Sequence, residues 1–165
     1  MERDRSIADR DSAMNHDLPA TDSFSDYREY PAPLPLAGHL LCFWTQSITS
    51  RGAYRHRVLP DACLDIVFIN DDPPVVVGPW TSAFIADLPA SAKVVGARWH
   101  PGRATALLGL AATEMLNQSV PLNCVWNRAT NLRFARVTDQ ADLAARRTAL
   151  EAALLTRLGM LLLWT

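Results

Sequence analysis

The chain has 165 residues, with 16 Lys and Arg against 17 Asp and Glu, a net charge of −1 and 49% hydrophobic residues. Such a composition can bury a core, which excludes a wholly disordered chain. It also disfavours nucleic-acid binding driven by bulk charge, because phosphate contacts need an excess of Lys and Arg on one face.

The ends of the chain carry no targeting signal that we recognise. Residues 1–26 are rich in Asp, Ser and Arg, so we expect a flexible leader without the apolar segment of a secretory signal. Leu158–Trp164 is the most apolar stretch and is too short to cross a bilayer. The three cysteines form no Cys-x-x-Cys pair, which favours reduced thiols. The sequence therefore predicts a cytoplasmic protein without membrane contacts.

The middle of the chain has a sequence pattern typical of short β-strands joined by turns. Short apolar or alternating runs are separated by Pro, Gly, Asn and Asp, and Asn70–Pro74 is the clearest turn. We expect strands at His39–Thr45, Ala53–Val58, Cys63–Ile69, Val75–Gly78, Ala83–Asp87 and Val94–Trp99. Six short strands joined by tight turns predict a small antiparallel sandwich or barrel.

After Pro101 the spacing of the apolar residues becomes typical of α-helices. Short helices are expected at Arg103–Leu108 and Thr113–Asn117, and a longer one is expected to start near Asp139, which can cap it. The fold class is thus α+β, with a leader at 1–26, a β-rich domain at 27–137 and a C-terminal linker or dimerisation helix at 138–165. Leucines at near-helical spacing form a stripe on this last helix: Leu143, Leu150, Leu154, Leu158 and Leu161. The stripe either packs on its own domain or forms a homodimer.

The segment from Pro101 to Pro121 could pass for a helix-turn-helix, with its turn at Gly109. The second helix of such a unit, at 111–119, would carry Glu114 as its only charged group, with no Arg or Lys to meet bases or phosphates. We therefore expect these helices to pack against the sheet and the chain not to contact DNA directly.

No motif for catalysis or metal binding is present. The histidines are never paired two apart as a strand-borne metal site requires, no Gly-x-Ser-x-Gly sequence occurs, and Cys63 lies in an apolar run that raises the pKa of its thiol. No Gly-rich phosphate loop occurs either. The sequence predicts no catalytic residues, no metal, no cofactor and no enzyme.

Two charges interrupt strands that should be largely buried. Asp65 lies among Leu, Ile and Val, and Arg98 lies between Ala and Trp. A buried charge needs a partner and hydrogen bonds, so Asp65 is either a paired core acid or part of an effector pocket. The strand tryptophans Trp44, Trp80 and Trp99 are open to the same two interpretations, core or ligand platform.

Several blocks of the sequence together resemble a known family. They are, in order, Val58–Phe68, Val77–Pro79, Val95–Gly102, Leu107–Gly109 and Val120–Leu122. Over roughly residues 27–158 the chain resembles the N-terminal domain of AraC-type bacterial transcription regulators. It departs from the family pattern at Ala62, where glycine is usual in the turn before Cys63, and at Thr165, where such regulators continue into a domain with two helix-turn-helix units.

The resemblance implies a cupin-like sensing or dimerising domain that lacks its DNA-reading partner. We expect a small-molecule effector to bind near Trp44, Asp65, Arg98 and His100, and the chain to form a homodimer. DNA would be read by the C-terminal domain of full-length relatives. Two alternatives remain open at this point: a truncated, stand-alone module that shares the dimer surface of full-length partners, and a small cupin-like metalloenzyme.

Overall fold

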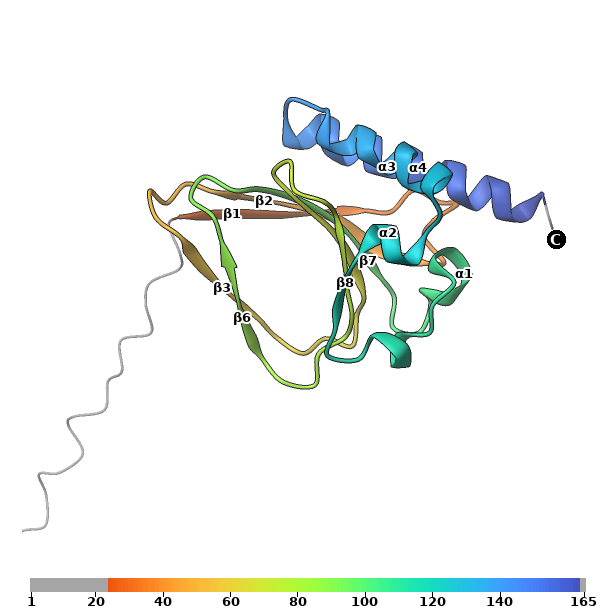
Figure 1. The fold of residues 1–165 in the computed structure, drawn as a ribbon, viewed down its shortest axis with the longest axis horizontal. Helices are drawn as coiled ribbons and strands as arrows, with labels where there is room; N and C mark the ends of the chain where they lie inside the picture. Colours follow the sequence, from red (N-terminus) through yellow and green to blue (C-terminus); the bar gives the residue numbers. More distant parts are fainter. Residues whose placement is uncertain (1–23, 164–165) are drawn as a thin grey trace, which may run out of the picture.

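A computed structural model describes residues 24–163 of the chain (Figure 1). Along these residues the strands are β1 (Ser25–Pro31), β2 (Leu40–Ile48), β3 (Tyr54–Val58), β4 (Asp65–Ile69), β5 (Val75–Val77), β6 (Phe84–Leu88), β7 (Lys93–Trp99) and β8 (Ser119–Pro121). The helices are α1 (Thr105–Leu108), the 3₁₀ helix η1 (Ala112–Met115), α2 (Leu122–Val125), α3 (Arg128–Thr138) and α4 (Leu143–Leu162).

The strands form two antiparallel sheets stacked like a sandwich. The larger sheet has six strands in the order β1-β2-β7-β4-β5-β8, and the smaller one pairs β3 with β6. Helices α3 and α4 lie side by side along the larger sheet, away from β3 and β6 (Figure 1). The structure confirms the predicted α+β class, with an antiparallel β-body followed by C-terminal helices.

The central strands are covered on both faces. Phe43, Ile66 and Trp99 belong to a core cluster that also contains Leu150 and Leu154 of α4. On the opposite face, Trp44 of β2, Val94 of β7 and Leu88 of β6 form a second cluster beneath the small sheet. Because successive side chains of a strand point to opposite faces, one pair of strands supplies both clusters.

The six strands expected from the sequence correspond to β2–β7, whereas β1 and β8 were not expected. Both lie at the edges of the larger sheet. Most side chains of β1 are exposed, and β8 has only three residues and ends in Pro121. An edge strand can expose its side chains and tolerate proline, so neither strand has the apolar alternation of a central one.

The predicted start of the long helix is wrong. Asp139 adopts helical angles (φ −68°, ψ −13°) and ends α3, a helix that the sequence analysis did not anticipate. Asp142 is extended (φ −133°, ψ 167°), and its side chain accepts a hydrogen bond from the Ala145 amide at 2.8 Å. An N-cap requires this extended backbone, so Asp142 begins α4.

The segment 101–121 does not form a helix-turn-helix. Helix α1 has four residues and ends at Gly109, whose φ is 77°, and the chain continues through η1 into β8. Leu107, Leu108 and Met115 are buried in the core shared by the sheet and α4. The expected packing of this segment against the sheet is confirmed.

The leucine stripe of α4 faces the protein's own core. Leu150 and Leu154 are fully buried, and Leu143, Leu158 and Leu161 are partly buried against the same cluster. The interpretation that this stripe packs on its own domain therefore holds. The homodimer stays a prediction, and it would have to use a surface other than Leu150 and Leu154.

Arg146 fastens the start of α4 to the sheet. It is 6% exposed, and its guanidinium donates to the Gln140 and Thr138 carbonyls at 3.0 Å each and to the Asn70 carbonyl. It also forms an ion pair of 2.7 Å with Asp71 in the turn after β4. One buried cation thus joins the α3–α4 connection to the β4–β5 turn.

The two predicted domain limits, after residues 26 and 137, can be compared with the observed strands and helices. The expected leader at 1–26 lies mostly outside the described residues, and β1 already begins at Ser25. The limit at 137/138 falls at the end of α3, but α4 beyond it shares the core of the strands. Within residues 24–163, no helix combines the length and apolar character needed to cross a bilayer.

The turn before β4 contains a non-glycine residue in the left-handed region of backbone space. Ala62 is exposed and has a φ of 57°. The Asp61 side chain accepts a hydrogen bond from the Cys63 amide at 2.9 Å, which holds the turn closed. Alanine is strained in this region, so the turn forms at a cost.

Replacing Ala62 by glycine should stabilise the protein. We expect Ala62→Gly to raise the free energy of unfolding by about 0.5–1 kcal/mol, since relief of strain exceeds the added freedom of the unfolded chain. Urea unfolding measures the change. The matched control is Ala152→Gly at an exposed position of α4. This substitution should lower the free energy of unfolding by about 1 kcal/mol, because glycine is a poor helix former. Equal losses in both variants would contradict the strain at Ala62.

Candidate functional site

A cavity of about 220 Å³ lies between the two sheets. Its walls come from alternate residues of the eight strands, so it occupies the face of the larger sheet that α4 does not cover. Most of the lining side chains are apolar. They are Tyr27, Trp44, Gln46, His56, Val58, Asp65, Val67, Ile69, Val75, Val77, Phe84, Ala86, Leu88, Val94, Arg98 and Ser119.

Strand register places the charged residues next to each other at one end of the cavity. Arg98 lies between Cys42 of β2 and Asp65 of β4, and Asp65 faces Val77 of β5. The next row along the strands holds Trp44, Gly96 and Val67. Directly opposed residues of an antiparallel pair share a face, so Arg98 and Asp65 meet across the ladder.

The Trp44 indole crosses an intervening strand to reach Asp65. Its Nε1 donates a hydrogen bond to Asp65 Oδ1 at 3.0 Å, although β7 separates β2 from β4. The ring lies over Gly96, where a Cβ would sit 2.3 Å from Trp44 Cε2. Glycine is therefore required at this position for the ring to lie flat across β7.

Three carboxylates surround the guanidinium of Arg98. Its Nε lies 3.2 Å from Asp65 Oδ1 and 3.6 Å from Asp61 Oδ2, and its Nη1 lies 3.8 Å from Glu29 Oε1. Asp65 and Arg98 are mostly buried, with side chains 13% and 22% exposed, whereas Asp61 and Glu29 are at least 41% exposed. The Arg98–Asp65 contact is the buried member of this group.

Burial controls the protonation of the pair. Loss of solvation raises the pKa of Asp65 to about 6, against the opposing effects of the Arg98 charge and the Trp44 hydrogen bond. Burial alone would lower the pKa of Arg98, but the charges of Asp65, Tyr27 and Asp61 raise it above its usual value. Asp65 is therefore a carboxylate at neutral pH whose charged form depends on Arg98.

The cavity wall continues through Tyr27 and Gln46, which face each other across β1 and β2. The Tyr27 hydroxyl donates to Glu29 Oε1 at 2.8 Å, and burial together with this bond raises the pKa of Tyr27 well above its usual value. Gln46 is 3% exposed and lies within hydrogen-bond distance of Ser25 and His56. The polar wall residues thus have protein partners.

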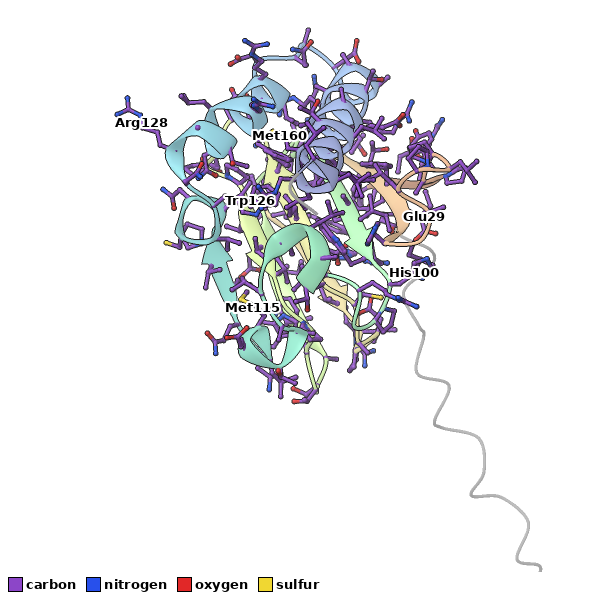
Figure 2. All side chains as sticks on the ribbon, turned by 90° about the vertical axis from the view of Figure 1, so that its right-hand side faces the viewer. Glu29, His100, Met115, Trp126, Arg128 and Met160 are labelled. Atoms are coloured by element: carbon purple, nitrogen blue, oxygen red, sulfur yellow. The ribbon has the colours of Figure 1, made fainter. Side chains whose placement is uncertain are left out.

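The structure brings together three of the four predicted pocket residues. Trp44, Asp65 and Arg98 line the cavity, and Asp65 accepts hydrogen bonds from both of the others, but His100 does not line it. His100 follows the last residue of β7, is half-buried at the periphery of the molecule, and its Nε2 lies 3.2 Å from the Ala37 carbonyl (Figure 2). The prediction for His100 does not fit this cavity, because the strand ends before the residue can face inward.

The other two tryptophans considered as ligand platforms, Trp99 of β7 and Trp80 of the β5–β6 connection, are not part of the cavity wall. Trp99 is fully buried on the face covered by α4, and Trp80 packs against Phe84 with ring centroids 4.3 Å apart. Tyr27, Gln46 and His56 line the cavity without having been predicted. Tyr27 and His56 lie on strands with many exposed or charged neighbours, so no apolar run marked them.

The structure also describes the Cys63 thiol and the placement of metal-ligand residue types in the described part of the chain. Burial raises the pKa of the Cys63 thiol to about 11, with the Asp61 charge adding to the effect. Residues 24–163 contain no group of three or more His, Cys, Asp or Glu placed to hold one metal ion. The site consists of a cavity with a hydrogen-bonded ionic group at one end.

Residues 28–121 match a protein family described as a domain of unknown function, DUF6597. The match covers more than half of the chain, so the chain belongs to this family. It begins within β1, includes β2 to β7 with Trp44, Asp65 and Arg98, and ends with β8. No curated protein and no solved structure matches the chain.

The contact between Gly96 and Trp44 can be tested with one methyl group. We expect Gly96→Ala to displace the indole from Asp65 and to lower the free energy of unfolding by about 1–3 kcal/mol, as overpacking does elsewhere. Urea unfolding and near-ultraviolet circular dichroism measure both effects. Gly38→Ala is the control, because a Cβ there meets nothing within 4 Å. If both variants behave alike, the close approach is not required.

The dependence of Asp65 on Arg98 predicts a pH-dependent loss of stability. Because the unfolded carboxyl titrates near its usual pKa and the folded one near 6, Asp65 makes the folded protein less stable as pH rises through this window. Arg98→Met leaves the carboxylate without its cation, so we expect a loss of about 3–5 kcal/mol near pH 8 and a smaller loss near pH 5. Urea unfolding at the two pH values measures the difference.

The control for this prediction is the same substitution in an Asp65→Asn background. The extra loss near pH 8 should then disappear, since no buried carboxylate remains to be paired. An Arg98→Met loss that is the same at both pH values would show that Arg98 acts through packing instead.

Proposed function

We propose that this chain binds a small molecule between its two sheets and acts as the sensing domain of an AraC-type transcription regulator. The observation that carries the proposal is the 220 Å³ cavity with apolar walls and a polar group at one end. Ligand pockets combine mainly apolar walls with a few placed polar groups. The ordered sequence resemblance to AraC-type regulators supports the regulatory part of the proposal.

The size of the cavity limits the ligand. Ligand pockets usually measure about 300–1,000 Å³, and an engineered apolar cavity of about 150 Å³ in another protein holds benzene. A volume of 220 Å³ therefore suits one ring with a short substituent. The ring would contact Val67, Val94 and Leu88, and the substituent would face Asp65 and Arg98.

The same strands connect the cavity to the helices. Trp44 and Arg98 face the cavity, while their neighbours Phe43 and Trp99 face the core beneath α4. A ligand that binds one arrangement of β2 and β7 more tightly than another would shift the packing of α4 by the difference in affinity. In a full-length regulator this shift would reach the DNA-reading domain.

The small sheet provides the cover of the cavity. Its strands β3 and β6 form their ladder with each other, not with the six-stranded sheet. Ala86, Phe84 and Val58 meet the cavity from this side. A ligand would therefore add contacts between the two sheets, and these contacts would raise the stability of the protein.

Filling the cavity with a larger side chain from the small sheet should weaken ligand binding. We screen single-ring metabolites by thermal shift and confirm them by calorimetry, and we expect at least one to bind the native protein. Ala86→Phe places a phenyl ring in the cavity and should lower affinity for that compound by at least about tenfold.

The matched control is Ile85→Phe, on the same strand but pointing outward, with 43% of its surface exposed. This variant should bind as the native protein does. If no compound binds, or if both variants bind equally, the sensing function is refuted.

A further inference from the structure

The charge at the polar end of the cavity is negative despite the buried arginine. Arg98 contributes one positive charge, whereas Asp65, Asp61 and Glu29 lie 3.2–3.8 Å from its guanidinium nitrogens. These four side chains sum to a formal charge of −2. An arginine in a pocket would ordinarily suggest an anionic ligand, but this guanidinium is already overcompensated.

Asp65 keeps spare capacity to accept hydrogen bonds. Its Oδ1 accepts a hydrogen bond from Trp44 Nε1 at 3.0 Å and another from Arg98 Nε at 3.2 Å. Its Oδ2 has a contact of 3.4 Å with the same Arg98 Nε. A carboxylate offers about four acceptor positions, so the cavity-lining Asp65 can accept a further N–H donor.

Aromatic rings lie beside this carboxylate. Trp44 and Tyr27 both line the cavity, and their ring centroids are 5.8 Å apart. The faces of tryptophan and tyrosine attract cations, and the attraction grows where water is excluded. The volume and the apolar walls of the cavity limit the size of the ligand. The aromatic rings and the carboxylates favour a ligand with a positive charge.

We infer that the ligand of this cavity is a protonated amine attached by a short chain to a single ring. The ammonium group hydrogen bonds to Asp65 beside the Trp44 and Tyr27 rings, and the ring occupies the apolar part of the cavity. This inference rests on the proposed function, because it assigns a ligand class to the same cavity. A carboxylate on the same skeleton is repelled by Asp65, Asp61 and Glu29.

Three compounds of nearly equal size separate charge from shape: 2-phenylethylamine, 2-phenylethanol and phenylacetate. Calorimetry on the full chain should show the amine binding roughly tenfold more tightly than the alcohol, with the carboxylate weakest. An alcohol that binds as well as the amine, or a carboxylate that binds best, overturns the inference while leaving ligand binding intact. If none of the three binds but another compound of the screen does, the inference alone fails.

A pair of exposed carboxylates tests the charge without touching the buried cluster. Glu29→Gln with Asp61→Asn removes two negative charges near Arg98 and keeps acceptor oxygens at both positions. We expect amine affinity to fall roughly two- to fivefold and alcohol affinity to stay unchanged.

The control removes the same charge elsewhere. Asp72→Asn with Asp87→Asn changes the turn after β4 and the outward face of β6, so amine affinity should stay at the native value. Asp65→Asn, which removes the proposed acceptor charge, should lower amine affinity more than the Glu29 and Asp61 pair does. Equal amine binding by the native protein and all these variants overturns the inference.

Discussion

Strands β2 and β7 lie in the middle of the six-stranded sheet, and both of their faces must be covered. Helix α4 covers one face and buries Phe43 and Trp99. The other face carries Trp44 and Arg98 and is covered by the β3–β6 pair, which forms a sheet of its own. Two separate sheets do not close against each other as tightly as a helix closes on a sheet here, and the space between them is the cavity. The layering thus places the candidate site and separates it from the core cluster that α4 covers.

The free-energy cost of the buried ionic group supports the proposed binding role. Taking Asp65 and Arg98 out of water costs free energy that their attraction only partly returns, and well-packed apolar residues are often as stable. Here the pair is also satisfied by the Trp44 indole, which reaches Asp65 only because Gly96 has no side chain. The contacts among Trp44, Asp65 and Arg98, together with the lack of a side chain at Gly96, hold polar atoms in a defined arrangement at the cavity wall. The proposed ligand-binding site would use such an arrangement.

The sequence predicted the elements whose own residues carry a strong pattern. Strands β2–β7 alternate or form apolar runs, and α4 carries its leucine stripe, so each was expected near its observed position. Edge strands β1 and β8 lack such a pattern because the sheet does not bury them on both faces. The start of α4 was misplaced because Asp139 and Asp142 are equally good caps by residue type, and only the backbone of the α3–α4 turn distinguishes them. Arg146 was missed because two of its four partners, Asn70 and Asp71, lie 76 and 75 residues away in the chain.

The sequence by itself determined that the chain is α+β, and it marked Asp65 and Arg98, because a charge inside an apolar run must find a partner. It also indicated Trp44 as a possible pocket residue. Only the tertiary structure decided that Arg98 lies opposite Asp65, that Trp44 crosses β7 at Gly96, and that His100 lies outside the cavity. These facts depend on strand order and register, which are set by contacts between residues far apart in the chain. Length, composition and charge bounded the kind of protein, while the pairing of β2, β7 and β4 built the site.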